Sequence, residues 1–101
     1  MRNPKKITVI IPVFNREKYI SRCLRSLLNQ NLEKKFFEII VINDGSTDKT
    51  KFVLDMYKED ITIINNKKNL GLPKSLNKGI KKSRSTYIVI VDSDDYVNEN
   101  F

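Results

Sequence analysis

Four short apolar runs alternate with segments of helical period, and this alternation restricts the fold more than any other feature of the chain. The apolar runs are Ile7 to Val13, Phe37 to Ile42, Ile61 to Ile64 and Tyr87 to Val91. The helical segments between them are Arg16 to Leu28, Thr47 to Tyr57 and Leu72 to Lys82. This order predicts right-handed βαβ crossovers, and therefore an α/β fold with a mainly parallel sheet and helices on both faces. The continuous apolar character of the runs predicts strands that are buried on both sides.

The expected helices have recognisable ends and apolar faces. Asn15 is expected to cap the first helix. Pro73 stands in the first turn of the third helix, where proline is tolerated. The second helix is expected to bury Phe52, Val53 and Met56.

Size and composition indicate a single globular domain. A chain of 101 residues builds one core, and its apolar runs are far shorter than the roughly 20 residues of a membrane span. The lysine-rich start does not lead into a signal peptide, so we expect the cytosol. The lone Cys23 cannot form an internal disulfide and is expected to be a small core residue. Because the chain has no histidine, carboxylates must carry any chemistry that it performs.

A formal charge of +7 predicts attraction to anions such as nucleotides, nucleic acid or acidic lipid headgroups. The basic residues are spread through helices and loops, as at Lys67-Lys68 and Lys81-Lys82, which favours ordinary solvated faces. A basic nucleic-acid-binding domain is an alternative function. However, the chain has no aromatic stacking strand or recognised reader motif, so no nucleic-acid partner is expected.

Polar residues follow every expected strand, at Asn15-Arg16, Asn43 to Ser46, Asn65-Asn66 and Asp92 to Asp95. Parallel strands bring these ends to one edge of the sheet, where open α/β sheets bind ligands. The tetrad Asp92-Ser93-Asp94-Asp95 is the strongest signal, because adjacent carboxylates repel one another unless a cation joins them. Carboxylates suit Mg²⁺ or Mn²⁺ together with substrate phosphates. The alternative is that the tetrad is only a solvated turn.

The glycine-rich phosphate loops of other α/β proteins are absent. Neither G-x-G-x-x-G nor G-x-x-x-x-G-K-[ST] occurs, so Rossmann dinucleotide binding and P-loop phosphoryl transfer fit poorly. A cation on the tetrad would instead hold and neutralise a diphosphate without a glycine cradle.

Five motifs occur in a characteristic order, at Val9 to Asn15, Glu38 to Asp48, Asn69 to Gly71, Asn77 to Ile80 and Asp92 to Asp95. Together they resemble the donor-binding half of the family 2 inverting glycosyltransferases, whose fold is GT-A (Rossmann-like). The resemblance runs from about Ile7 to Asp95, which is nearly the whole chain. It is specific as a set, although each motif alone is weak.

The resemblance implies roles for individual residues. The nucleotide site would comprise Pro12, Val13, Phe14, Asn15, Asp44, Lys74, Asn77, Asp92 and Ser93. In that reading Asp44 hydrogen-bonds a uracil-type base, and Asp92 faces the ribose and the sugar. Asp94 would hold Mn²⁺ or Mg²⁺ against the diphosphate, with Asp95 as a neighbour. Leu76 departs from the pattern, because relatives often carry a basic residue there. The structural alternatives are favoured for Gly45 and Gly71 as turn residues and for Asp48 as a helix cap.

The resemblance also implies a function, namely binding of a nucleotide-diphospho-sugar, a UDP-sugar first of all, for inverting transfer to a glycan or another hydroxyl acceptor in polysaccharide biosynthesis. No candidate general base follows Asp95, since Glu99 is too close in sequence, so no catalytic residue is assigned. Residues 1–101 are therefore expected to be one nucleotide-sugar-binding domain from the N-terminal part of a longer enzyme. A non-catalytic nucleotide-sugar-binding module is the alternative. The resemblance also allows peripheral association of the full enzyme with the cytosolic face of a membrane.

Overall fold

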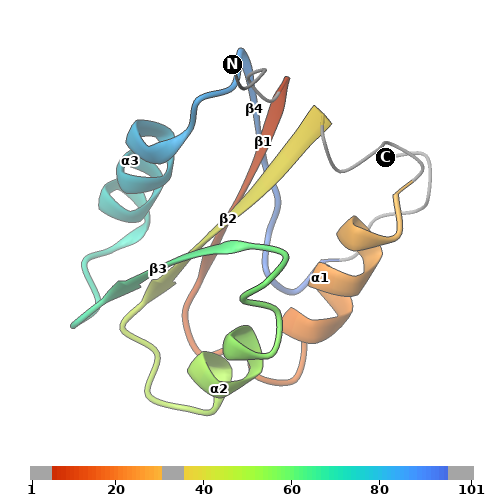
Figure 1. Cartoon of the computed structure of the whole chain (residues 1–101). Helices are drawn as coiled ribbons and strands as arrows, with labels where there is room; N and C mark the ends of the chain where they lie inside the picture. The colour runs from red at the N-terminus through yellow and green to blue at the C-terminus, as the bar shows by residue number, and fades with distance from the viewer. Residues whose placement is uncertain (1–5, 31–35, 96–101) are drawn as a thin grey trace.

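The computed structural model describes residues 6–30 and 36–95, which form a four-stranded sheet between helices (Figure 1). The strands are β1 (Ile7–Val13), β2 (Phe37–Asp44), β3 (Thr62–Asn66) and β4 (Tyr87–Ile90). The helices are α1 (Ile20–Leu28), α2 (Thr50–Asp55) and α3 (Leu72–Lys82). The sheet order is β3-β2-β1-β4, and every neighbouring pair is parallel. The expected α/β fold with a parallel sheet is confirmed.

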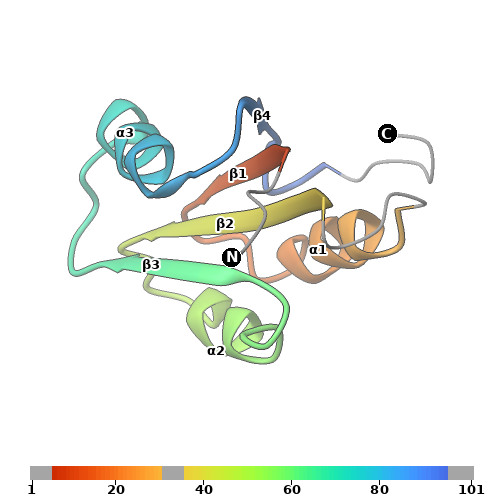
Figure 2. The same cartoon turned by 45° about the horizontal axis from the view of Figure 1, so that its top comes forward.

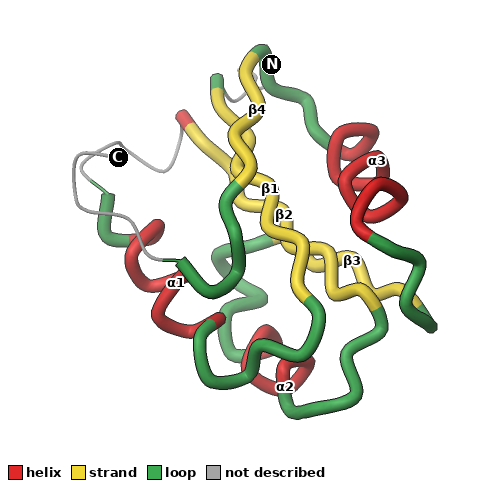
Figure 3. Tube along the Cα trace, turned by 180° about the vertical axis from the view of Figure 1, so that it is seen from behind, coloured by secondary structure: helices red, strands yellow, loops and turns green. Residues whose placement is uncertain are grey.

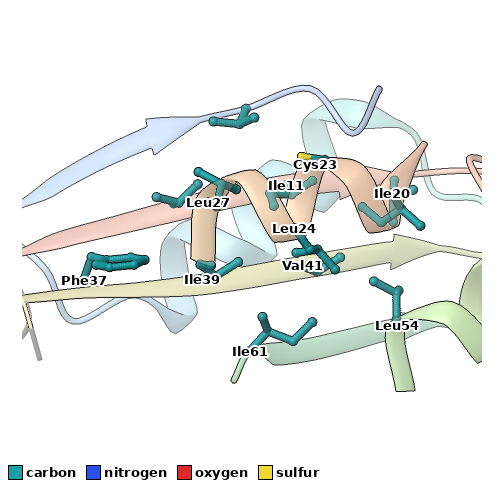
Figure 4. Close-up of a cluster of buried hydrophobic side chains, with 13 residues drawn as sticks. Ile11, Ile20, Cys23, Leu24, Leu27, Phe37, Ile39, Val41, Leu54 and Ile61 are labelled. Atoms are coloured by element: carbon teal, nitrogen blue, oxygen red, sulfur yellow. The ribbon is translucent and has the colours of Figure 1, made fainter. Parts of the chain in front are cut away.

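Helices cover both faces of the sheet, with α1 and α2 on one side and α3 on the other (Figure 2). The larger core lies under α1 and α2, where Leu24 and Leu27 pack with strand residues such as Ile11 and Val41 (Figure 4). Cys23 belongs to this core and is fully buried, as expected. Burial of each large aliphatic side chain contributes roughly 1.5–3 kcal/mol, so this core supplies much of the stability.

A smaller core lies beneath α3 and contains Ile10, Ile40 and Ile42. Gly79 lets the helix approach these side chains closely. A Cβ at this position would lie 2.9 Å from Ile42 Cδ1 and 3.0 Å from Ile10 Cγ2. The absence of a side chain at Gly79 therefore sets the distance between α3 and the sheet.

The order of the strands reverses at β1, which creates the crevice where ligands of such sheets bind. From β1 the chain proceeds to β2 and β3 on one side, and then returns to place β4 on the other. The β1–β4 pairing ends at Ile10 opposite Ile90, and the last bond runs from Val91 N to Ile10 O (3.0 Å). The backbone N–H and C=O groups of successive residues in a strand point to opposite neighbouring strands. Those of Ile10 point to β4, so the backbone of Pro12 points to the same side, beyond the end of β4. Its missing N–H therefore costs no bond in the ladder.

Two expected helices begin later than the apolar spacing predicts. The first begins at Ile20 with Tyr19 as its N-cap, so the prediction that Asn15 caps it is wrong. Asn15 instead has a positive φ of 53°, and its side chain bonds the loop before α2. The second helix begins at Thr50, because residues 47–49 belong to that loop. None of the helices in the described residues is long and apolar enough to cross a lipid bilayer.

The burial predicted for α2 and β4 is partly wrong. Phe52 and Met56 are exposed, whereas Leu54 is the fully buried residue of α2. Only one side of this short helix packs against the core. Strand β4 lies at the edge of the sheet, so Ile88 and Ile90 are exposed rather than buried on both sides. Strand β3 runs Thr62–Asn66, which places Asn66 within the strand rather than in the loop that was expected after Ile64.

Candidate functional site

A cavity of about 430 Å³ opens at the carboxyl edge of the sheet, where the strand order reverses. Seven predicted site residues line it, namely Pro12, Val13, Phe14, Asp44, Asp92, Ser93 and Asp94. They come from the ends of β1, β2 and β4, which the sheet brings together (Figure 3). The cavity therefore joins the predicted base-binding residue and the predicted metal-binding residue in one site.

The other three predicted residues lie elsewhere in the structure. Lys74 and Asn77 are exposed on α3 and do not line the cavity. Asn15 is also absent from the cavity wall, because its side chain bonds the β2–α2 loop. Its Oδ1 accepts hydrogen bonds from Thr47 N (2.7 Å) and Asp48 N (3.3 Å). Asn15 thus holds two of the strand-end loops together.

Five further residues line the cavity that the sequence reasoning did not place in the site, namely Arg16, Asn69, Gly71, Leu72 and Ser75. Asn69 and Gly71 belong to a motif of the family resemblance, so a signal for them existed. Arg16 follows a strand end directly and could have been included on position alone. Leu72 and Ser75 carried no signal, since they enter the cavity only because Gly71, the N-cap of α3, bonds Asp44 at the end of β2.

Asp44 is buried and tied into the loop that precedes α3. Its Oδ1 accepts hydrogen bonds from Leu70 N (2.7 Å) and Asn66 Nδ2 (2.9 Å), and its Oδ2 accepts one from Gly71 N (3.0 Å). Burial raises the pKa of Asp44, but these bonds, with a contribution from Ser75, outweigh it and hold the pKa below the ordinary value. Asp44 is therefore an ionised acceptor fixed in the wall of the cavity.

Gly45 allows this loop to approach the end of β2. It has a positive φ of 75°, and a Cβ here would lie 2.5 Å from Lys68 C and 2.6 Å from Asn69 N. No larger residue fits without moving the backbone of the loop. The structural role expected for Gly45 is therefore supported, and it positions the N–H groups that bind Asp44.

Asp48 has a structural role, but the N-cap of α2 is Lys49, so Asp48 lies one residue before the position that a helix cap would occupy. Its Oδ1 accepts a hydrogen bond from Thr50 N (2.9 Å) at the start of α2, and its Oδ2 accepts one from Glu17 N (3.3 Å). Burial raises the pKa of Asp48, but the bonds from Thr50 and Glu17 outweigh it and lower the pKa overall. Asp48 thus joins the β1–α1 loop to α2 and lies outside the cavity wall.

The tetrad is both a turn and part of the cavity wall. Asp95 N donates to Asp92 O (3.1 Å), which closes a β-turn, while Ser93 is buried. The carboxylates of Asp92, Asp94 and Asp95 are exposed, and their oxygens lie within 4.8 Å of one another. No hydrogen bond or ion pair within residues 6–30 and 36–95 reaches these three carboxylates.

Two side chains of helix α1 contact backbone carbonyl groups of the tetrad. Arg22 Nη2 donates to Asp94 O (3.2 Å), and Cys23 Sγ lies 3.6 Å from Asp92 O. Burial, followed by the negative charges of Asp95 and Asp94, raises the pKa of Cys23 to about 11. The thiol therefore remains protonated at neutral pH and can donate to the carbonyl.

This carboxylate arrangement fits a hard divalent cation. Three carboxylates lie close to one another, and two of them, Asp92 and Asp94, line the cavity. Mg²⁺ or Mn²⁺ accepts one or two carboxylates together with phosphate oxygens. A cation there would also relieve the repulsion between neighbouring carboxylates. No general base is assigned among the described residues, and Glu99 lies outside them.

The chain is similar to known glycosyltransferases along nearly its whole length. Residues 8–101 match the model of the family described as glycosyl transferase family 2. The poly(ribitol-phosphate) beta-glucosyltransferase of Bacillus spizizenii is 44% identical over 96 residues, which cover 91% of this chain and 15% of that protein.

Solved structures of Staphylococcus aureus TarS, a poly(ribitol-phosphate) beta-N-acetylglucosaminyltransferase, show the same fold. The complex of its residues 1–349 with UDP aligns with a TM-score of 0.88 and 37% identity, over 94% of this chain and 29% of that one. The complex with UDP-GlcNAc aligns with a TM-score of 0.87 and the same identity, over 93% and 28%. The chain thus spans less than a third of each protein that it matches here.

Proposed function

Because this chain belongs to glycosyltransferase family 2, we propose that it is a donor-binding domain that holds a UDP-sugar through a divalent cation for inverting transfer. One observation carries the proposal, namely the cavity that places Asp44 and Asp94 in one wall. One relative of the same fold, TarS, is 37% identical to this chain and has been solved in complex with UDP and with UDP-GlcNAc. The domain would be the N-terminal part of a longer enzyme.

The uracil ring of the donor would lie at the end of the cavity that Asp44 forms. A fixed, ionised carboxylate accepts a hydrogen bond from the ring N3–H of uracil, whereas the N3 of cytosine carries no hydrogen and would repel it. Pro12, Val13 and Phe14 line the cavity and would contact the nucleoside. Contacts of Asn15, Lys74 and Asn77 with the nucleotide stay predictions, since these residues do not line the cavity.

The diphosphate would lie at the end formed by the tetrad. Asp92 and Ser93 would face the ribose and sugar, and Asp94 would hold the cation, with Asp95 beside it. Mg²⁺ or Mn²⁺ would neutralise the diphosphate and stabilise it as a leaving group. Arg22 and Cys23 would keep the tetrad in position through its carbonyl groups.

Transfer needs a base that these residues do not supply. An acceptor hydroxyl, deprotonated by a residue outside the described ones, would attack the anomeric carbon in line and invert it. A hydroxyl-bearing glycan as acceptor, a role in polysaccharide biosynthesis and a cytosolic location stay predictions. The non-catalytic alternative predicts binding without transfer even when the longer reading frame is restored.

A thermal unfolding series tests the donor site. UDP at a hundredfold excess over its Kd, with Mn²⁺, should stabilise the chain by about 2.7 kcal/mol. For a domain of this size the melting temperature should rise by roughly 10 °C. CDP with Mn²⁺ is the matched control and should give a much smaller shift. If no nucleoside diphosphate shifts the transition, the proposal fails.

A further inference from the structure

Lys78 on α3 bonds a buried amide that in turn bonds Asp44. Lys78 Nζ donates to Asn66 Oδ1 over 2.6 Å, and Asn66 is 7% exposed. On the other side of the amide, Asn66 Nδ2 donates to Asp44 Oδ1 (2.9 Å) and to Ser75 Oγ (3.2 Å). Neither Lys78 nor Asn66 lines the cavity. A single side chain therefore joins a surface cation to the carboxylate at one end of the cavity.

Strand register and helix period bring these groups together. Asn66 pairs in register with Asp44 at the ends of β3 and β2, so both side chains project from the same face of the sheet. This is the face that α3 covers (Figure 2), because Ile42, two residues before Asp44, packs in the core beneath α3. Ser75 and Lys78 are three residues apart and therefore lie on the same side of α3. The contact thus joins three regular elements of the fold.

The Lys78 contact allows the Asn66 amide only one orientation. An ammonium group carries only donors, so it must meet the amide oxygen, and the amide NH₂ group then points to the ionised carboxylate of Asp44. If the amide were turned by half a rotation, two donors would meet at Lys78 and two acceptors at Asp44. The charge of Lys78 also polarises the amide, which strengthens the bond that the amide donates. Lys78 therefore orients and strengthens a bond to Asp44 through Asn66.

Asn66 holds the Asp44 carboxylate from the sheet. Asp44 Oδ1 also accepts a bond from Leu70 N, and Oδ2 accepts one from Gly71 N. These two donors belong to the loop before α3, whereas Asn66 belongs to β3. Without an oriented amide at Asn66, the carboxylate could turn more freely about its last torsion, which is soft in aspartate. A hydrogen bond weakens steeply when it is misaligned, so a bond from Asp44 to a ring N–H would weaken as well.

We propose that Lys78 is a positioning residue for base recognition, which acts through Asn66 to hold the Asp44 carboxylate in the orientation that accepts the N3–H of uracil. The inference rests on the proposed role of Asp44 in the donor site. Lys78 should raise the affinity for UDP but not the affinity for CDP, because the N3 of cytosine carries no hydrogen. A general attraction between Lys78 and the diphosphate would raise both affinities equally.

Calorimetric titration of UDP and CDP, each with Mn²⁺, into the variant Lys78→Met tests the proposal. The affinity for UDP should fall about fivefold, and the affinity for CDP should change less than about twofold. Lys78→Arg should restore most of the UDP affinity, because a guanidinium group also carries only donors. The matched control is Lys81→Met, which removes the same charge from an exposed position of the same helix. Its UDP affinity should stay within about twofold of the unmodified chain.

A double-mutant cycle measures the contact without any ligand. In urea unfolding, Lys78→Met and Asp44→Asn together should cost less than the sum of their separate losses, because both changes disable the same chain of bonds. Additive losses would overturn the proposal, as would equal losses of UDP and CDP affinity in Lys78→Met or no recovery in Lys78→Arg. Coupling in urea with unchanged UDP affinity would overturn the role of Lys78 and leave the donor site standing. If the unmodified chain binds no nucleoside diphosphate, both proposals fail.

Discussion

Two carboxylate regions share the cavity and differ in how the fold treats them. Asp44 is 5% exposed and its oxygens accept bonds from Leu70, Gly71 and Asn66. The carboxylates of the tetrad are exposed, and nothing in the described residues bonds to them. One end of the site is therefore part of the folded structure, whereas the carboxylates at the other end are open to the cation that we propose. The predictions below separate the two ends.

The largest effect should come from Gly45→Ala, which attacks the fixed end. The new Cβ would meet the backbone of Lys68 and Asn69 and would adopt an unfavourable positive φ. We expect a loss of about 3 kcal/mol in the free energy of unfolding, measured with urea. Gly71→Ala is the control, because no atom lies within 4 Å of the added Cβ and only the backbone strain remains. A loss at Gly45 no greater than at Gly71 would contradict the close approach.

Asp44→Asn and Asp94→Asn should differ although both remove one carboxylate from the same cavity. At Asp44 the amide replaces an acceptor of charge-assisted bonds, so we expect a loss of about 2 kcal/mol. At Asp94 the change removes repulsion among exposed carboxylates, so stability should stay within about 0.5 kcal/mol or rise. Urea unfolding without metal measures both. Similar losses would mean that the two ends are equally structural.

Acid should weaken the fixed end of the site. The pKa values of Asp44 and Asp48 are lowered in the folded state. Their bonds therefore contribute stability above the unfolded value near 3.9, and this contribution is lost as the pH falls through the lower folded values. The free energy of unfolding should decline below about pH 4, and less steeply in Asp44→Asn. An unchanged slope in that variant would show that Asp44 does not drive the decline.

The smallest effect concerns Cys23, which supports the tetrad. Because burial, with the charges of Asp95 and Asp94, raises its pKa to about 11, the thiol should resist a thiol reagent at pH 8. It should react quickly once urea unfolds the chain. Fast reaction in the folded protein would show that Cys23 is not packed beneath Asp92. Mn²⁺ with UDP should slow any residual reaction, since it orders the tetrad above the thiol.

Local patterns predicted the fold where local forces decide it. Strand β1 and helix α3 have the predicted bounds, because a continuous apolar run specifies one and helical spacing after Gly71 specifies the other. The prediction that Asn15 caps α1 was wrong because Asn15 bonds Thr47, which lies 32 residues away. The prediction that β4 is buried on both sides was wrong because the apolar run Tyr87 to Val91 does not reveal that the strand lies at the edge of the sheet.

The cavity, too, was predictable only where local patterns decide it. Asp44 at the end of β2 and Asp94 shortly after β4 line it, because the carboxyl ends of parallel strands lie at one edge of the sheet. Leu72 and Ser75 enter it through the packing of α3, which has no signature in the sequence. The bonds that Asp44 accepts from Leu70 N and Gly71 N also depend on loop geometry, so only the structure distinguishes Asp44 from the open carboxylates of the tetrad.

The most direct test is calorimetric titration of UDP into the unmodified chain, Asp94→Asn and Asp55→Asn, each with Mn²⁺ and with a chelator. Asp55 is exposed on α2, so its variant controls for the loss of one surface carboxylate. We predict that UDP binds tightly only with Mn²⁺, that Asp94→Asn weakens this binding at least about tenfold, and that Asp55→Asn does not. Binding that is independent of Mn²⁺, or unchanged in Asp94→Asn, would contradict a donor site completed by a cation on the tetrad.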